Sequence, residues 1–282
     1  MNNNPLLEDL KTYFKEVYVI NGRISTLDAS LTRFGTEMRI EGDPDQTLIG
    51  SMTTFRDITQ HPAGDFNLYA PDFSYDIIRK DVDTELENLR NDYFCLSVAQ
   101  CYEVFESFLF NILSSYFELF PEELAKVGLL NTGSVLVRED IRSLVLKKAQ
   151  GANNDGLRSI LKKCSTHYEA HEKKNEFFDL NLWFTMISQV RHVLVHGRKI
   201  LSSNFFENLK QRKCLHFFQK YFQTRKTETE ESIFIDRLAT LNLISDLNSF
   251  SFFIFKSLSV EQSMSISVPQ YGTGVWFNKS TN

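Results

Sequence analysis

The chain has 282 residues, of which 42% are hydrophobic and 24% are charged, and its formal net charge at pH 7 is −5. This composition is typical of a globular protein with one large domain or a domain with an appendage. The negative charge argues against a protein that coats nucleic acid through bulk positive potential, but it allows an RNA-acting site with a local basic surface. Twenty-five phenylalanines beside six prolines and twelve glycines favour helical packing over a turn-rich β-sandwich.

The N-terminal 80 residues are expected to form a mixed appendage. Residues 5–17 have the apolar spacing of a short amphipathic helix. From 18 to about 80, short runs such as RFGTEMRIEG lie between glycine, Asp-Pro and His-Pro, a pattern that favours strands and loops. We therefore expect an irregular or β-containing segment over residues 1–80.

The remainder of the chain has the pattern of a helical domain. Residues 81–119 predict one long helix or two nearly continuous ones, ended by Pro121. Further helices are expected over 122–150, in the polar stretch 157–174 and over 204–223, and a final long helix begins at Arg237. Residues 223–236 favour a surface loop or small hairpin. The predicted fold is mainly α, an up-and-down helical bundle over residues 81–263 with an extended tail over 264–282.

Cysteines and apolar segments bear on the compartment. The four cysteines have neither a CxxC pair nor zinc-finger spacing, so we interpret them as reduced, mostly buried thiols of a cytoplasmic protein: Cys95, Cys101, Cys164 and Cys214. The N-terminus lacks the basic and apolar regions of a secretory signal. The apolar stretch 250–258 is short and contains Lys256, which favours a core helix and no membrane association.

The most informative stretch is WFTMISQVRHVLVHG, residues 183–197. Its apolar residues recur at the spacing of a buried helical stripe, with Asn175 or Asp179 as a plausible N-cap. Arg191, His192 and His196 occupy the final turns. A guanidinium can neutralise charge on phosphate oxygens and an imidazole can move a proton near neutral pH, so the set suits phosphodiester chemistry. The alternative is an arginine bonded to a buried carboxylate and two histidines at a hydrated helix end.

The spacing between Arg191 and His196 restricts how they act. Five positions along a helix correspond to about 140° of rotation, so the two side chains do not share one face. They converge only if the helix frays at His196 or if a second copy faces the first.

With Arg191, a polar residue directly after it, and His196 near the helix end, the sequence resembles the HEPN family. A second match is the earlier helix containing FESFLFNIL, where family members often carry a glutamate; Glu106 is the candidate and Glu103 the alternative. The resemblance covers about residues 85–258. It implies a helical endoribonuclease that needs no metal or other cofactor and uses the ribose 2′-OH as nucleophile. The resemblance also implies a dimer formed through the helix that carries the motif from Arg191 to His196, here called the motif helix.

The resemblance also implies catalytic roles and partners. Arg191 would stabilise charge on the phosphate, His196 would act as general acid or base, His192 would position substrate or assist, and Glu106 would orient Arg191 or His196. RNA would be the substrate, in phage defence or as a toxin with a neutralising antitoxin protein. However, His192 stands where many members have asparagine, and some members lack catalysis. The alternative function is a non-catalytic scaffold that binds RNA or a protein.

The two histidine pairs allow a metal-binding alternative. His192 with His196, and His167 with His171, are each spaced to ligate one metal from one helical face, but neither has a third ligand at a recognisable spacing; for His167 and His171, solvated surface side chains are favoured.

Basic residues follow the stretch from Arg191 to His196. They predict either an RNA-binding rim beside the cleft that holds these catalytic candidates or a solvated helix face: Lys210, Arg212 and Lys213, with Lys220, Arg225 and Lys226. Aromatic residues could stack bases or belong to the core: Trp183, Phe218 and Tyr221.

Overall fold

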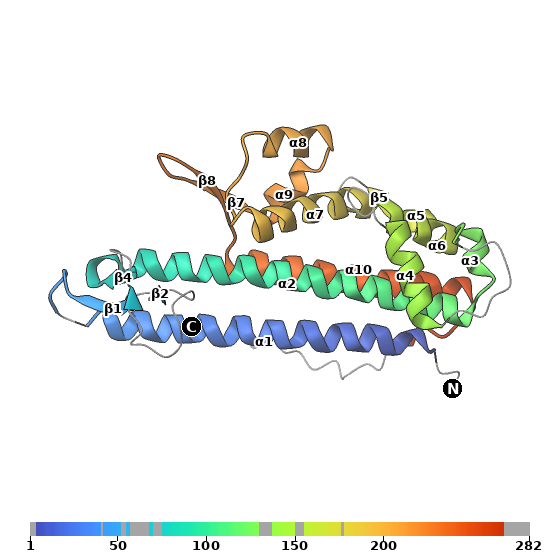
Figure 1. Cartoon of the computed structure of the whole chain (residues 1–282), viewed down its shortest axis with the longest axis horizontal. Coiled ribbons are helices and arrows are strands. Elements are labelled where there is room, and N and C mark those ends of the chain that lie inside the picture. Colours follow the sequence, from blue (N-terminus) through green and yellow to red (C-terminus); the bar gives the residue numbers. More distant parts are fainter. Residues whose placement is uncertain are drawn as a thin grey trace. The chain divides into compact units, whose positions relative to one another are not determined.

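The computed structural model describes residues 4–40, 42–51, 55–56, 68–69, 75–129, 137–149, 155–175 and 178–267. In this part of the chain the fold is mainly α, as the sequence predicts, with ten α-helices and four two-stranded antiparallel sheets (Figure 1). The chain divides into two compact units. One contains residues 1–20 and 95–282, and the other residues 21–94. Both boundaries between the units fall inside long helices, α1 (Leu6–Met38) and α2 (Val82–Leu119).

The smaller unit pairs the end of α1 with the start of α2. The intervening chain forms β1 (Thr47–Ser51), β2 (Phe55–Arg56), β3 (Leu68–Tyr69), β4 (Tyr75–Ile78) and a 3-10 helix, Arg79–Asp81. β1 pairs with β4 and β2 pairs with β3. A small core around Ile77, Val82 and Leu86 packs against apolar residues of α1. Arg79 fastens the loop after α1, because its Nη1 donates to the carbonyls of Met38 and Ile40, both at 2.7 Å.

The expectation of strands and loops directly after residue 17 is wrong for residues 18–38, which continue α1. The misleading signal was the short runs between glycines in this part of the sequence, a pattern that is typical of strands and loops. In the structure Thr26, Ser30, Thr32 and Thr36 each donate a side-chain hydrogen bond to the carbonyl four residues earlier. Their hydroxyl groups are thereby satisfied within the helix instead of competing with it. The strands expected in this region do form, but after residue 46.

The larger unit contains the remaining elements, which we give with their bounds: α3 (Glu123–Lys126), α4 (Arg138–Ala149), α5 (Asp155–Cys164), α6 (Thr166–His171), β5 (Lys173–Asn175), β6 (Phe178–Asp179), α7 (Leu180–His196), α8 (Phe205–Gln211), α9 (Leu215–Tyr221), β7 (Gln223–Lys226), β8 (Glu231–Phe234) and α10 (Arg237–Glu261). The predicted helix over 81–119, the hairpin option over 223–236 and the helix start at Arg237 are confirmed. The predicted polar helix over 157–174 is instead two helices, because Ser165 interrupts it and caps α6. The tail predicted over 264–282 lies largely outside the described residues.

The core of this unit is built from aromatic side chains on α1, α2, α7 and α10. Tyr13 of α1 lies against Phe105 of α2, with ring centroids 6.2 Å apart. Phe105 also contacts Phe184 of α7 at 5.3 Å, and Trp183 contacts Phe250 of α10 at 4.6 Å. Burying large aromatic groups supplies much of the hydrophobic stabilisation of such a unit. The motif helix α7 is therefore held on two sides by the core.

All four cysteines are buried and free, as the sequence predicts. Burial raises the pKa of the Cys101 and Cys164 thiols to about 12. Since the thiolate is the reactive form of cysteine, these two residues serve as core side chains.

Among the described residues α10 is the helix whose length and apolar composition would allow it to cross a membrane. In the structure it packs against α5, α6 and α9, and the most apolar part of it is 44% buried. Core helices of globular proteins have the same composition, so one such helix is weak support for a membrane span. The cytoplasmic location stays a prediction.

Candidate functional site

The local sequence explains where α7 begins and ends. Asp179, one of the two predicted caps, accepts a hydrogen bond from the Leu182 amide at 3.0 Å, and is the N-cap of the helix. At the other end the amides of Gly197 and Lys199 both donate to the Val193 carbonyl, at 2.9 and 3.1 Å. A Cβ at Gly197 would lie 2.9 Å from that carbonyl oxygen. The glycine is therefore needed for space at the helix end.

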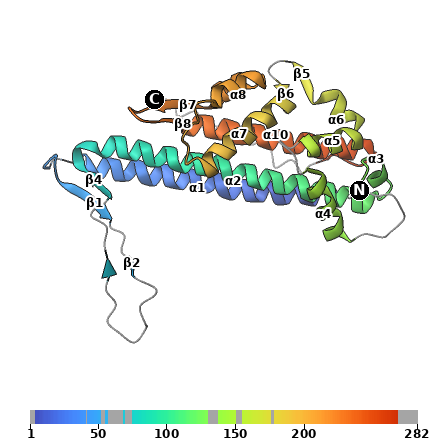
Figure 2. The same ribbon diagram turned by 45° about the horizontal axis from the view of Figure 1, so that its top comes forward.

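The turn after α7 is bound to the β7–β8 hairpin. The Ile233 amide donates to the Lys199 carbonyl at 2.9 Å, and the Leu201 amide donates to the Glu231 carbonyl at 2.8 Å. Ile200 forms an antiparallel bridge with Ser232. Residues 199–201 thus pair with β8 over a short stretch and connect the C-terminal end of α7 to the hairpin, whose strands β7 and β8 are labelled in Figures 1 and 2.

Arg191 is half-buried and is oriented by a glutamate of α2. Its Nη2 donates to Oε1 of Glu103 at 3.3 Å, and the two side chains are 32% and 53% exposed. Arg191 Nε is buried and has no hydrogen-bond partner in the described part of the chain. A guanidinium has five N–H donors, so the exposed donors of Arg191 that Glu103 does not use can contact a ligand. The glutamate that contacts Arg191 is Glu103, the alternative of the sequence analysis, and the role of Glu106, which is half-buried on the same helix, stays a prediction.

His192 and His196 lie on the exposed side of the last turns of α7. Both residues are exposed, and their ring centroids are 5.0 Å apart. In the described part of the chain neither imidazole has a hydrogen-bond partner. This arrangement agrees with the alternative of an arginine bonded to a carboxylate and two histidines at a hydrated helix end, except that the carboxylate, Glu103, is exposed and not buried. The two imidazoles are close enough to act on one ligand.

Several basic residues follow this helix end in the sequence. Arg198 and Lys199 follow the motif directly, and both have left-handed backbone angles, with φ of 48° and 62°. Lys210, Arg212 and Lys213 are exposed on α8 and the turn after it. None of these three takes part in an ion pair within the described residues. Exposed cations that take part in no ion pair can contact phosphate groups.

The aromatic candidates are mainly core residues. Trp183 and Phe218 are fully buried, in agreement with the structural alternative for them. Tyr221 is buried too, and its hydroxyl group accepts a hydrogen bond from Trp183 Nε1 at 3.3 Å and donates one to Asp246. Burial, together with this contact to the Asp246 carboxylate, raises the pKa of Tyr221 to about 12. Lys220 also donates to Asp246, at 2.8 Å.

The second histidine pair differs from the prediction of solvated surface side chains. His167 and His171 are half-buried and stacked, with ring centroids 4.4 Å apart. His167 Nδ1 is 3.0 Å from Oγ of buried Ser257, and His171 Nδ1 is 2.8 Å from the His167 carbonyl oxygen. The pair lies where α6 packs against α10. The polar residues next to these histidines in the sequence predict a solvated surface and give no sign of this packing. Across the described residues no three His, Cys, Asp or Glu side chains are grouped to hold a metal ion.

The comparisons with known proteins leave this site without a relative. No protein-family model, no curated protein and no solved structure matches the chain. The resemblance to HEPN domains therefore depends on the residues around Arg191 and His196 and on the glutamates of α2.

Proposed function

We propose that the protein is an endoribonuclease of the HEPN type that cleaves RNA without a metal ion. The observation that carries the proposal is the end of α7, whose last two turns hold the partly exposed guanidinium of Arg191 and two exposed imidazoles that have no hydrogen-bond partner among the described residues. Histidines without a structural contact are free to exchange protons with a substrate.

The chemistry follows from the residue types. An imidazole removes the proton of a ribose 2′-OH, the 2′-oxygen attacks the adjacent phosphorus, and the bond from phosphorus to the 5′-oxygen breaks. A protonated imidazole supplies the proton that the leaving 5′-oxygen takes up. The products are a 2′,3′-cyclic phosphate and a 5′-hydroxyl end. Arg191 stabilises the negative charge that develops on the phosphate oxygens, and Glu103 orients Arg191.

The proposal includes a homodimer formed through the motif helices. Within one copy His196 is rotated about 140° from Arg191 around the helix axis. His192 and His196 are 5.0 Å apart in the same copy and are suited to share one phosphodiester. A facing copy would bring its Arg191 to that phosphodiester. Lys210, Arg212 and Lys213 would contact the RNA backbone on either side of the cleavage point.

The biological setting is proposed from the resemblance alone. HEPN nucleases act in phage defence and as toxins, and a toxin of this type is held inactive by an antitoxin protein. We propose such a role, in the cytoplasm, for this protein.

The test is cleavage of RNA in the presence of EDTA. Wild type is expected to cut, and His196→Ala and Arg191→Ala are each expected to cut about 10²- to 10⁴-fold more slowly, the usual effect of losing an acid–base group. His171→Ala is the matched control, because this histidine has the same spacing from its partner but lies on α6. An RNA with 2′-O-methyl groups should resist cleavage. Intact RNA with wild type, or equal cleavage by all variants, would refute the proposal.

A second candidate function is a non-catalytic scaffold that binds RNA or a protein partner. The ion pair between Arg191 and Glu103 favours it, because a guanidinium that holds two helices together has a structural role without catalysis. The same experiment separates the two candidates. A scaffold would remain dimeric and bind RNA in a mobility-shift assay while leaving it intact.

A further inference from the structure

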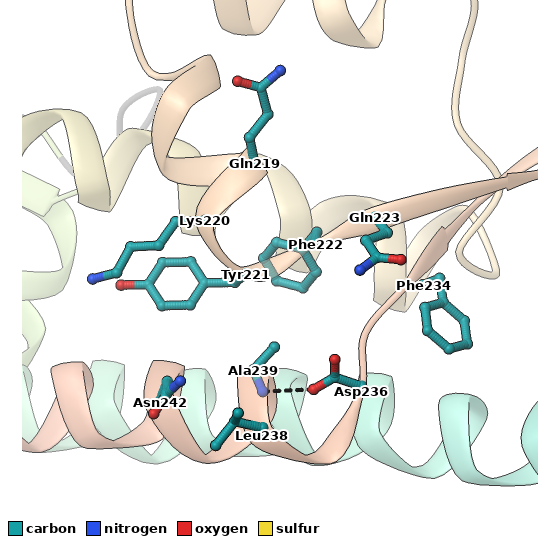
Figure 3. A pocket seen from close by; sticks show the side chains of 10 residues that line it. All are labelled: Gln219, Lys220, Tyr221, Phe222, Gln223, Phe234, Asp236, Leu238, Ala239 and Asn242. Carbon is teal, nitrogen blue, oxygen red and sulfur yellow. Dashed lines mark hydrogen bonds between the residues drawn. The ribbon is translucent and has the colours of Figure 1, made fainter.

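A pocket of about 220 Å³ lies between the end of α9, the start of β7 and the first turns of α10 (Figure 3). Pockets for drug-sized ligands usually measure about 300–1,000 Å³, so this one suits a single ring system. It is in the same compact unit as the motif helix.

The lining of the pocket combines aromatic rings with free amide groups. Two of its rings, Tyr221 and Phe222, are buried, and the third, Phe234, is half-buried with the guanidinium of Arg225 4.0 Å from its ring centroid. Gln223 of β7 and Asn242 of α10 reach it from opposite sides, as Figure 3 shows. Both amides are exposed and have no hydrogen-bond partner among the described residues. An amide offers a donor and an acceptor side by side, and an aromatic ring offers a stacking surface.

The pocket is poorly suited to a free anion. Its lysine, Lys220, donates to Asp246 at 2.8 Å, so the positive charge is already compensated. Asp236 at the edge of the pocket adds a negative charge and caps α10 through the Ala239 amide at 2.8 Å. The ligand that fits these groups is a neutral planar ring with hydrogen-bonding edges.

Strand pairing places this pocket beside the end of the motif helix. In β8, Ile233 is hydrogen-bonded to Lys199, and the next residue is Phe234 of the pocket. The short strand over 199–201 is antiparallel to β8. Going from Ile233 to Phe234 therefore moves toward Arg198 and the turn that follows His196. Successive residues in a strand are about 3.3 Å apart, so pocket and motif share one end of the hairpin.

We infer that this pocket binds one nucleobase, in the RNA that the motif residues cleave. The base would stack on the half-buried ring of Phe234 and present its edge to Gln223 and Asn242, whose amides can form paired hydrogen bonds with a base. The inference rests on the proposed nuclease function and adds base selectivity to it. The same chemistry would accept a free nucleotide, which the experiment separates from a strand.

The experiment compares wild type with the double variant Gln223→Met/Asn242→Leu. These changes remove the amide groups but keep the side-chain size, at two exposed positions where folding should be unaffected. Asn208→Leu, an exposed amide of α8 outside the pocket, is the matched control. Binding of AMP, GMP, CMP and UMP is measured by calorimetry. Binding of short labelled RNAs that contain one variable base is measured by anisotropy, using chains that also carry His196→Ala to prevent cleavage.

We expect wild type to bind RNAs that carry one or two of the four bases at the variable position at least about fivefold more tightly than the other RNAs. The double variant should lose this preference, and the Asn208→Leu control should keep it. Tight binding of a mononucleotide but no base preference in RNA would overturn the strand inference and indicate a free-nucleotide site. Equal binding by wild type and double variant would overturn the pocket altogether. RNA cleavage by wild type is measured separately. Cleavage without any base preference would refute only the inference of a base-binding pocket. A base preference without cleavage would refute the proposed nuclease function.

Discussion

Two histidines spaced four residues apart occur on two helices of this protein, and their surroundings differ. On α6, His167 and His171 are stacked and half-buried, and each has a hydrogen bond through Nδ1. On α7, His192 and His196 are exposed and have no protein hydrogen-bond partner in the described part of the chain. The spacing brings the rings together in both cases. The packing around them separates a structural pair from a pair that is available to a substrate.

The largest expected effect on stability is at α6. His167→Ala would leave the buried hydroxyl group of Ser257 without its histidine partner, and an unsatisfied buried polar group costs about 1–3 kcal/mol. His192→Ala removes an exposed side chain and should change the free energy of unfolding by no more than about 0.5 kcal/mol. Urea denaturation of both variants measures the difference. Equal losses would show that the two pairs are alike.

A smaller difference is expected between the helix caps. Ser165→Ala removes two contacts, the cap to the Tyr168 amide and the hydrogen bond to the Ser257 carbonyl, and should cost about 2 kcal/mol. Asp179→Ala removes the cap of α7 and a longer ion pair with exposed Lys173, 3.6 Å away, and should cost about 1 kcal/mol. Thermal unfolding followed by circular dichroism gives both values. A larger loss in the free energy of unfolding for Asp179→Ala than for Ser165→Ala would contradict this expected order.

The smallest expected effect is in chemical reactivity. Diethylpyrocarbonate modifies accessible imidazoles, so His192 and His196 should react several-fold faster than His167 in the native protein, at rates near that of exposed His216. Mass spectrometry of peptides locates the modified residues. In urea the difference should disappear, and its persistence there would mean that local sequence, and not packing, controls the rates.

The sequence predicted those features that depend on local patterns. The apolar spacing of residues 183–197, the cap at Asp179 and the glycine at 197 are local signals, and α7 has the predicted bounds to within three residues. The accessibility of the two histidine pairs depends on which helix packs over them, and this information is not local. Ser257, which contacts His167, is 90 residues away in sequence. The same reason explains Glu103 and Glu106: both are near the required turn of α2, and only the packing of α2 against α7 selects the one that contacts Arg191.

In the N-terminal region, by contrast, local signals predicted the wrong secondary structure. Gly22 and Gly35 and the threonines between them lower helix propensity. Yet Leu31, Phe34 and Met38 lie on one side of α1 and pack on the small core of the residue 21–94 unit. Tertiary burial exceeded a weak local preference, as it commonly does for long helices.

The two residues after Gly197 combine a positive charge with an unfavourable backbone conformation. Arg198 and Lys199 adopt left-handed backbone angles, which cost a side-chain-bearing residue about 1 kcal/mol and cost glycine almost nothing. Glycine at either position would remove a cation from the end of the motif helix and relieve the backbone at once. The turn is thus a place where the chain maintains positive charge against its own conformational preference, beside the histidines that would receive a polyanion.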